Sequence, residues 1–240
     1  MISVIIESKN IQSESKKILI DDKNDVNHLK NSFRVKEGEV IRAVDGENEY
    51  ICKVLVIEKK EITLEILETR KDTDIKNTEI TAGLSIIKND KMELAIQKLT
   101  EIGVDKIIPL ETKRTIVKLN EKKDKWDVIV KEATKQCQRV RFLEIDNIKK
   151  LKDVDYSQYD LVIVPYECEE QYTLKNLLRN LENVPKKVLY MIGAEGGFDI
   201  SEIEYLKSME NVRIVTLGKS ILRAETAAIV VGGVLVNEFQ

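Results

Sequence analysis

The chain has 240 residues, of which 42% are hydrophobic and 34% are charged, and its formal net charge is −3. This composition supports a sizeable core, and it argues against long disorder and against a chain that coats nucleic acid indiscriminately. No apolar run approaches the roughly 20 residues of a membrane span. The N-terminus lacks a basic segment followed by an apolar one, so we expect a cytoplasmic protein.

Cysteine and histidine are scarce and scattered. The chain has Cys52, Cys137, Cys168 and a single histidine, His28. Their spacing fits neither a disulfide framework nor a zinc site, and no metal is expected. A Cys–His nucleophile pair is the less favoured alternative.

Residues 1–70 have the pattern of short strands joined by tight turns. Gly38 marks a turn between two extended runs, and Asp45-Gly46 is a hairpin signal before the next strand. Residues 61–68 alternate apolar and polar side chains. We therefore predict a small β-barrel over residues 1–70, followed by a polar linker at 71–78.

Residues 79–240 alternate predicted strands and helices. Met92, Ile96, Leu99 and Ile102 have helical spacing, and Gly103 ends that helix. Further helices are predicted at 126–139 and 225–238, with short apolar strands at 80–87, 106–110, 161–164, 188–192 and 213–217. This order predicts an α/β domain with a mostly parallel sheet.

The charge is unevenly distributed along the chain. Residues 1–70 carry 12 Lys/Arg and 14 Asp/Glu, a net of −2, whereas residues 112–141 carry 10 Lys/Arg and 4 Asp/Glu, a net of +6. Two interpretations stay open for the basic segment: a solvated helix face, or a stripe that binds phosphates.

Residues 193–198, Gly-Ala-Glu-Gly-Gly-Phe, join a predicted strand to a predicted helix, and we call them the glycine loop. Asp199 and Glu202 form a capping-box pattern at the start of that helix. Such a loop lies at the carboxyl edge of the sheet, where α/β proteins bind ligands, and glycine allows close backbone approach. A plain tight turn is the alternative, and the spacing fits neither a phosphate loop nor a dinucleotide fingerprint.

Residues 217–227 form a second segment of the same kind. A predicted strand ends at Leu217, a short loop contains Gly218, and Glu225 and Thr226 open an apolar helix. Either of these two side chains can simply stabilise the helix start. Arg223 and Glu225, however, flank a loop at the sheet's carboxyl edge, which favours a ligand site.

These two segments together resemble the 16S ribosomal RNA uracil-N3 methyltransferases (RsmE type) of the SPOUT superfamily. The resemblance covers nearly the whole chain. The other matching residues are His28-Leu29, Arg34, Gly38, Asp45-Gly46, Lys91-Met92, Lys98, Glu101–Val104, Pro109, Thr112, Arg114, Lys118, Glu132-Ala133, Gln136-Cys137, Arg139 and Tyr166-Glu167. Ala194 stands where the family often has Pro, and Ser220 stands where many members have Arg.

The resemblance implies the fold and the cofactor. Residues 1–70 correspond to a PUA-like RNA-binding barrel, and residues 79–240 to a SPOUT domain whose parallel sheet contains a deep trefoil knot. The knotted loops of this family hold S-adenosylmethionine, and the family is homodimeric. The residues that correspond to the donor pocket are Tyr166, Glu167, Gly193, Glu195, Gly196, Gly197, Leu217, Gly218, Leu222, Arg223, Glu225 and Thr226.

The implied reaction methylates N3 of a specific uridine, which removes the N3 proton and places negative charge on O2 and O4. A fixed arginine stabilises such charge, and Arg223 is the candidate. Glu225 or Glu195 orients this arginine or accepts the proton. No metal is needed.

The implied partner is 16S ribosomal RNA or the small ribosomal subunit. The candidate RNA-binding residues are His28, Arg34, Arg114, Lys118, Arg139 and Arg141. Two alternatives stay open: a SPOUT enzyme that methylates transfer RNA at a ribose 2′-O or a guanine, and an RNA-binding module without catalysis.

Overall fold

The computed structural model describes residues 1–72 and 77–239, so half of the predicted linker, residues 73–76, lies outside the described residues. The chain forms two compact units. The described residues up to 72, together with Thr134–Phe142, form the N-terminal unit, and the remaining described residues form the C-terminal unit. Sequence analysis assigns residues 134–142 to the second domain, whereas the structure groups them with the first.

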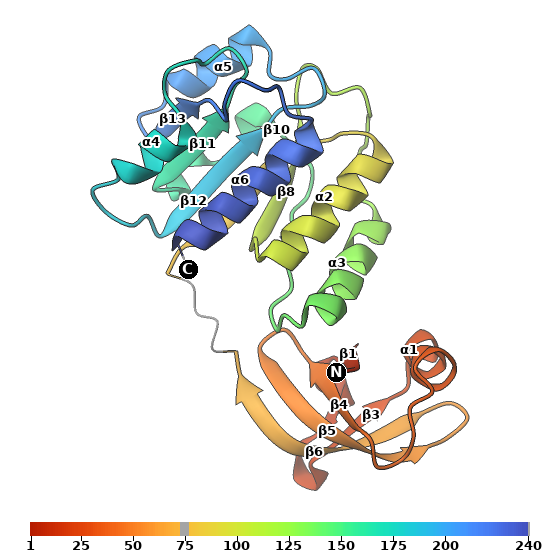
Figure 1. The fold of residues 1–240 in the computed structure, drawn as a ribbon. Coiled ribbons are helices and arrows are strands. Elements are labelled where there is room, and N and C mark those ends of the chain that lie inside the picture. The colour runs from red at the N-terminus through yellow and green to blue at the C-terminus, as the bar shows by residue number, and fades with distance from the viewer. Residues whose placement is uncertain (73–76, 240) are drawn as a thin grey trace. The chain divides into compact units, whose positions relative to one another are not determined.

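The N-terminal unit is a curved, mostly antiparallel sheet of six strands (Figure 1). Its spatial order is β1-β4-β5-β6-β3-β2, and only β1 and β4 pair in parallel. The predicted barrel is confirmed as half a barrel, with β1 and β2 as its edges. The strands are β1 Ser3–Ile5, β2 Ile11–Gln12, β3 Lys17–Ile20, β4 Val40–Val44, β5 Asn48–Ile57 and β6 Ile62–Lys71.

Two predicted turns of this unit are confirmed. Gly38 has a φ of 88°, and Gly46, between β4 and β5, has a φ of 98°, both in the region that favours glycine. The expectation that residues 1–70 contain strands throughout is wrong, because helical segments interrupt them. Two are short 3-10 helices, Ser8–Asn10 and Ser13–Ser15, and the longest is α1 (Lys23–Asn27), which continues into a π-helical turn, His28–Ser32. The Asp22 carboxylate starts this helix by accepting hydrogen bonds from two backbone amides.

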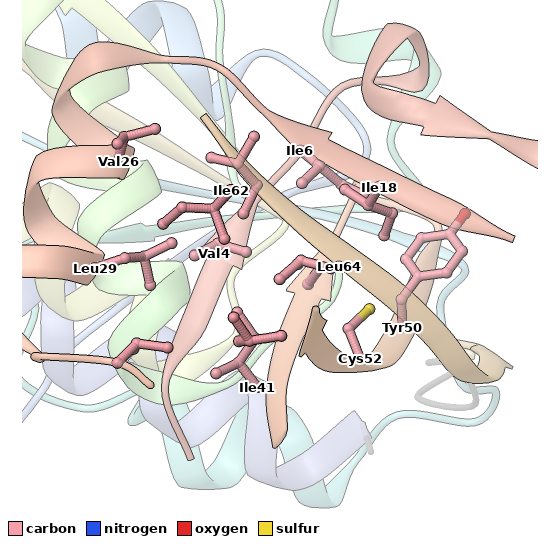
Figure 2. Packing of buried hydrophobic residues seen from close by; sticks show 14 residues of the cluster. Val4, Ile6, Ile18, Val26, Leu29, Ile41, Tyr50, Cys52, Ile62 and Leu64 are labelled. Atoms are coloured by element: carbon pink, nitrogen blue, oxygen red, sulfur yellow. The ribbon is translucent and has the colours of Figure 1, made fainter. Parts of the chain in front are cut away.

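The core of the N-terminal unit lies on the concave side of this sheet. Figure 2 shows Ile18, Ile41, Ile62 and Leu64 in close packing, all fully buried. Val26 of α1 and Leu29 of the π-helical turn join this cluster, because residues three apart share one face of a helix. The helical segment therefore covers part of the core that a closed barrel would bury.

The C-terminal unit contains a fully parallel sheet, which confirms the predicted α/β architecture. The strand order is β10-β8-β7-β12-β11-β13, and β9 also pairs with β8. The strands are β7 Glu79–Ser85, β8 Lys106–Glu111, β9 Glu144–Ile145, β10 Lys149–Lys150, β11 Leu161–Pro165, β12 Lys187–Ile192 and β13 Val212–Val215. The helices are α2 Asn89–Ile102, α3 Asp124–Cys137, whose last residues belong to the N-terminal unit, α4 Leu174–Arg179, α5 Ile200–Lys207 and α6 Ala224–Phe239.

Helices cover both faces of this sheet. Leu189 and Met191 of β12 pack in a cluster with Ile203 and Leu206 of α5. The intervening Tyr190 points to the opposite face, where its hydroxyl donates to the Ala228 carbonyl of α6 at 3.1 Å. On that face α2 and α6 lie side by side (Figure 1).

The predicted helix signals in this unit are confirmed. Gly103 ends α2 with a φ of 109°, and its amide donates to the Leu99 carbonyl. Asp199 and Glu202 form the predicted capping box at α5. No helix in the described ranges is long and apolar enough to cross a membrane.

Candidate functional site

A cavity of about 580 Å³ lies at the carboxyl edge of the parallel sheet. Because all strands run the same way, the segments after β7, β11, β12 and β13 all emerge at this edge. The cavity has the size of a pocket for a cofactor or drug-sized ligand. It is lined by Lys88, Lys91, Pro165, Tyr166, Glu167, residues 192–198, residues 216–225 and Ala227.

The glycine loop forms one wall with its own backbone. Gly197 has a φ of 70°, and its amide donates to the Ala194 carbonyl at 2.9 Å, so the turn closes with alanine at position 194. A methyl group on Gly193 would lie 2.8 Å from the carbonyl carbon of Gly197. The backbone therefore approaches so closely that residue 193 has room only for hydrogen.

The start of α5 holds the glycine loop in place from outside the cavity. The Asp199 carboxylate accepts from the Ser201 hydroxyl and amide, and Lys113 lies 3.3 Å from it. The Ser201 contacts, with those of Lys113, lower the pKa of Asp199 to about 2. Arg114 donates to the Gly196 carbonyl at 2.6 Å. These polar contacts fix where the loop meets the sheet.

The second wall is the segment between β13 and α6. The Thr216 hydroxyl accepts from the Gly218 amide at 3.2 Å, and Gly218 has a φ of 122°. Past this turn, Ile221 and Arg223 are exposed, whereas Glu225 in the first turn of α6 is buried. The Glu225 carboxylate lies 3.8 Å from the Lys91 ammonium. The sequence makes Glu225 a candidate for orienting Arg223, whereas the described ion pair of Glu225 is with Lys91.

The third wall comes from the segment after β11. Tyr166 and Glu167 line the cavity, and the Glu167 carboxylate packs against Gly197. A hydrogen bond with Cys168 raises the pKa of the Tyr166 phenol. In the described part of the chain, no three His, Cys, Asp or Glu side chains form a group suited to a metal ion.

Eleven of the twelve sequence-predicted pocket residues line this single cavity. They are Tyr166, Glu167, Gly193, Glu195, Gly196, Gly197, Leu217, Gly218, Leu222, Arg223 and Glu225. Thr226 is outside the lining, and its side chain is exposed. The cavity is also lined by Lys88, Lys91 and Ile221, which the sequence pattern did not assign to the site. Lys91 belongs to the family pattern, but only the fold shows that α2 begins beside the cavity.

The predicted RNA-binding residues are distributed over both units. In the N-terminal unit, the His28 ring stacks on the exposed Phe33, with ring centroids 4.7 Å apart, and Arg34 is exposed with a φ of 54°. Arg141 pairs with Asp72 at 2.8 Å, and the Arg139 carbonyl accepts from Arg42.

The remaining two candidates lie in the C-terminal unit. Arg114 is bound to the glycine loop, and Lys118 pairs with Glu111 at 2.9 Å. The described contacts therefore give the six residues different local roles.

Comparison with known proteins identifies the family. Residues 74–236 match the model of an RNA methyltransferase domain, and residues 20–67 match that of an RNA methyltransferase PUA domain. The chain belongs to this family of RNA methyltransferases. It is 31% identical over 219 residues to the ribosomal RNA small subunit methyltransferase E of Rickettsia conorii. This alignment covers 90% of this chain and 88% of the relative. The corresponding protein of Mesomycoplasma hyopneumoniae is 32% identical, over 85% of this chain and 87% of the relative.

The fold of the methyltransferase has close counterparts among solved structures. The ribosomal RNA small subunit methyltransferase E of Neisseria gonorrhoeae, bound to S-adenosyl methionine, superposes with a TM-score of 0.86. It is 26% identical and covers 99% of this chain and 97% of its own. The resemblance found in the sequence is therefore confirmed for the family, for the PUA-like unit and for the parallel-sheet domain.

Proposed function

We propose that this RNA methyltransferase transfers the methyl group of S-adenosylmethionine to N3 of a uridine in 16S ribosomal RNA. The cavity at the sheet's carboxyl edge carries this proposal, because two glycine-bearing loops there offer backbone groups for a nucleoside-like ligand. The names of the relatives support the ribosomal target, and the Neisseria gonorrhoeae structure supports the cofactor.

The residues of the cavity fit this cofactor. The volume of about 580 Å³ is adequate for it, and a Cβ at Gly218 would meet nothing within 4 Å, so the backbone there is open to close approach. Glu167 and Glu195 place carboxylates on the walls, which suits a ligand with a sulfonium and an ammonium group. When bound, S-adenosylmethionine supplies an electrophilic methyl group on a positively charged sulfur.

Side chains of the protein must stabilise the negative charge that develops on the uracil ring. The reaction replaces the N3–H bond of uracil by an N3–methyl bond, so one proton leaves and negative charge develops on O2 and O4. Arg223 lines the cavity and is exposed at its mouth, where a guanidinium can stabilise that charge. Glu225 and Glu195 are the carboxylates that orient cations or accept the proton.

We also propose how the protein binds its RNA and assembles. The PUA-like unit, with His28, Arg34, Arg139 and Arg141, binds ribosomal RNA, and Arg114 and Lys118 add positive charge near the pocket. We propose that the C-terminal unit contains a trefoil knot and forms a homodimer. We further propose that the protein acts in the cytoplasm, where small subunits are made. The exposed Val230 and Val234 of α6 support a partner surface on that helix.

Labelled S-adenosylmethionine and small ribosomal subunits that lack the modification test this function. We expect label in 3-methyluridine of 16S ribosomal RNA after nuclease digestion. Label confined to transfer RNA, or donor binding without any turnover, would contradict the proposal and favour one of the two alternatives.

The role of Arg223 has its own test. Arg223→Ala should lower the single-turnover rate by about 10²–10³-fold, the usual effect of removing a group that stabilises transition-state charge. Arg213→Ala is the matched control, since Arg213 lies on β13 and binds local carbonyls of Glu210 and Val212. Equal rates for Arg223→Ala and the control would remove Arg223 from the mechanism.

A further inference from the structure

Lys91 is the one ion-paired lysine among the residues that line the cavity. It lies in the first turn of α2, three residues after Lys88, which follows the end of β7. The next residue, Met92, is buried and anchors this turn in the core, so the Lys91 Cα is fixed at the cavity wall. The Lys91 side chain is 36% exposed, between the protein interior and solvent.

The buried carboxylate of Glu225 lies beside this lysine. The Glu225 side chain is only 9% exposed, and among the described residues Lys91 is the only cation within ion-pair distance of it. Burying a carboxylate without a counter-charge is strongly unfavourable, so Lys91 and Glu225 hold each other in place. Their separation of 3.8 Å is too long for a hydrogen bond.

This geometry leaves the Lys91 ammonium with unused donors. Its second acidic neighbour, Asp90, is 3.7 Å away, which is also beyond hydrogen-bond distance. An ammonium has three N–H donors, and within the described residues no hydrogen bond engages them. Arg114 and Lys113 differ in this respect, because hydrogen bonds to the glycine loop and to the start of α5 already occupy them.

We propose that Lys91 is a catalytic residue that donates a hydrogen bond to a carbonyl oxygen of the target uracil, with Glu225 as the positioning residue that holds it. This inference rests on the proposed function. A preorganised ammonium at the cavity stabilises the charge that develops on O2 or O4 as N3 loses its proton. Arg223, exposed at the mouth, supplies the second positive charge.

The two candidate carboxylates, Glu225 and Glu195, have different roles in this proposal. Protonation of Glu225 would remove the counter-charge of Lys91, so Glu225 is a poor proton acceptor. Glu195 is exposed, and its carboxylate accepts only a 3.2 Å hydrogen bond from the Lys88 amide among its described contacts. The N3 proton therefore passes to Glu195 and then to water. The N3 electron pair forms the bond to the methyl carbon, and sulfur keeps the electrons of the broken C–S bond.

The test compares Lys91→Gln and Lys91→Arg with the control Lys98→Gln. Lys98 also lies on α2 and pairs with Glu101 at 2.9 Å, but it does not line the cavity. Single-turnover methylation of unmodified small subunits is followed from about pH 6 to pH 9, and the dissociation constant of S-adenosylmethionine is measured for each variant. Asp90 lies 3.7 Å from the Lys91 ammonium, and the charged side chains that line the cavity with Lys91 are Lys88, Glu167, Glu195, Lys219, Arg223 and Glu225.

We expect Lys91→Gln to lose about 10²-fold in rate at neutral pH, the size of effect seen when one oxyanion donor is removed. Its rate should recover at higher pH, since uracil ionisation then needs less help, and its donor dissociation constant should stay close to that of the parent. Lys91→Arg should keep most of the rate, because the positive charge remains. Lys98→Gln should match the parent throughout.

Two results would overturn the assignment. One is a Lys91→Gln rate and pH profile equal to those of Lys98→Gln, and the other is a loss of rate matched by an equal loss of donor affinity. The parent's product reports separately on the proposed function. If the parent makes no 3-methyluridine, that function fails, whereas a normal parent product with an unaffected Lys91→Gln variant refutes only the role of Lys91.

Discussion

The two units use β-sheets of opposite kind, and this difference determines where functional residues gather. In the parallel sheet every strand ends at the same edge, so Lys91, Glu167, Glu195 and Arg223 meet at one cavity although they span more than half of the chain. The mostly antiparallel sheet has connections at both ends. A parallel sheet therefore concentrates a site, while an antiparallel sheet distributes contacts over a surface.

The N-terminal unit illustrates the second case. Lys30 binds the Glu58 carbonyl, which places the turn that carries His28 near the hairpin between β5 and β6. Arg141 instead pairs with Asp72, just beyond the opposite end of the β5–β6 pair. Strands β5 and β6 have ten residues each and are roughly 33 Å long. Such a spread suits contacts with the backbone of a folded RNA better than recognition of one base.

The units also bury charge in different ways. Arg42 of the N-terminal unit is 2% exposed, and each of its three guanidinium nitrogens donates to a partner: Glu49, the Ser3 hydroxyl, and the carbonyls of Gln138 and Arg139. Glu225 of the C-terminal unit is almost as buried, but its one cationic partner among the described residues is 3.8 Å away. A buried charge whose hydrogen bonds are made within the protein stabilises the fold. A buried charge beside a cavity, with its counter-ion beyond hydrogen-bond distance, can still interact with a bound substrate.

The largest effect should follow from Arg42→Ala. This change leaves the Glu49 carboxylate with only the exposed Arg70 at 3.6 Å and removes the Arg42 donor of two carbonyls, and we expect a loss of about 3–5 kcal/mol in the free energy of unfolding of the N-terminal unit. Urea unfolding followed by a probe in that unit measures it. The exposed Arg70→Ala, which breaks the pair with Glu68 and a 3.6 Å contact with Glu49, should leave stability nearly unchanged, because solvent screens both pairs. Equal losses for both variants would refute the role of burial.

Gly193→Ala should have the next largest effect, and it should be confined to the cavity. The added methyl would meet the Gly197 backbone at 2.8 Å, so the glycine loop must shift. We expect donor affinity to fall by about tenfold to a hundredfold, corresponding to about 1–3 kcal/mol of strain. Isothermal titration with S-adenosylmethionine measures this.

The matched control for that change is Gly233→Ala on α6. A methyl group there meets nothing within 4 Å, and alanine favours the helix by up to about 1 kcal/mol. Donor affinity should then equal that of the parent, with unchanged or higher stability. A Gly193→Ala protein that binds the donor as tightly as the control would show that the loop is not closely packed.

The smallest effect concerns pH. Because the pKa of Asp199 is lowered to about 2, its ionised form stabilises the folded C-terminal unit above the unfolded pKa of about 3.9. This contribution is lost as pH falls from about 4 to about 2. Asp199→Asn should flatten the pH dependence of the urea midpoint in that window, and Lys113→Gln should flatten it partly. An unchanged slope in both variants would contradict the assignment.

The sequence by itself determined the elements whose signals are local. Hydrophobic periodicity located α2, and a continuous apolar run located α6. Gly103 and the Asp199–Glu202 capping box marked helix ends, and Asp45-Gly46 marked a hairpin turn. It missed the helix at Lys23–Asn27, whose single buried residue, Val26, gives too short a pattern to register a helical period. The family pattern added the eleven cavity residues, which periodicity alone does not identify.

Only the tertiary structure decided which side chains face each other. The sequence separates Lys91 from Glu225 by more than a hundred residues, and nothing local links them, whereas the fold places their charges 3.8 Å apart. In the same way, Arg114 is a basic residue in the sequence but a support of the glycine loop in the fold. Local patterns encode backbone conformation, but pairing across strands and helices depends on the packing of the whole sheet, and that packing assigns each charge its partner.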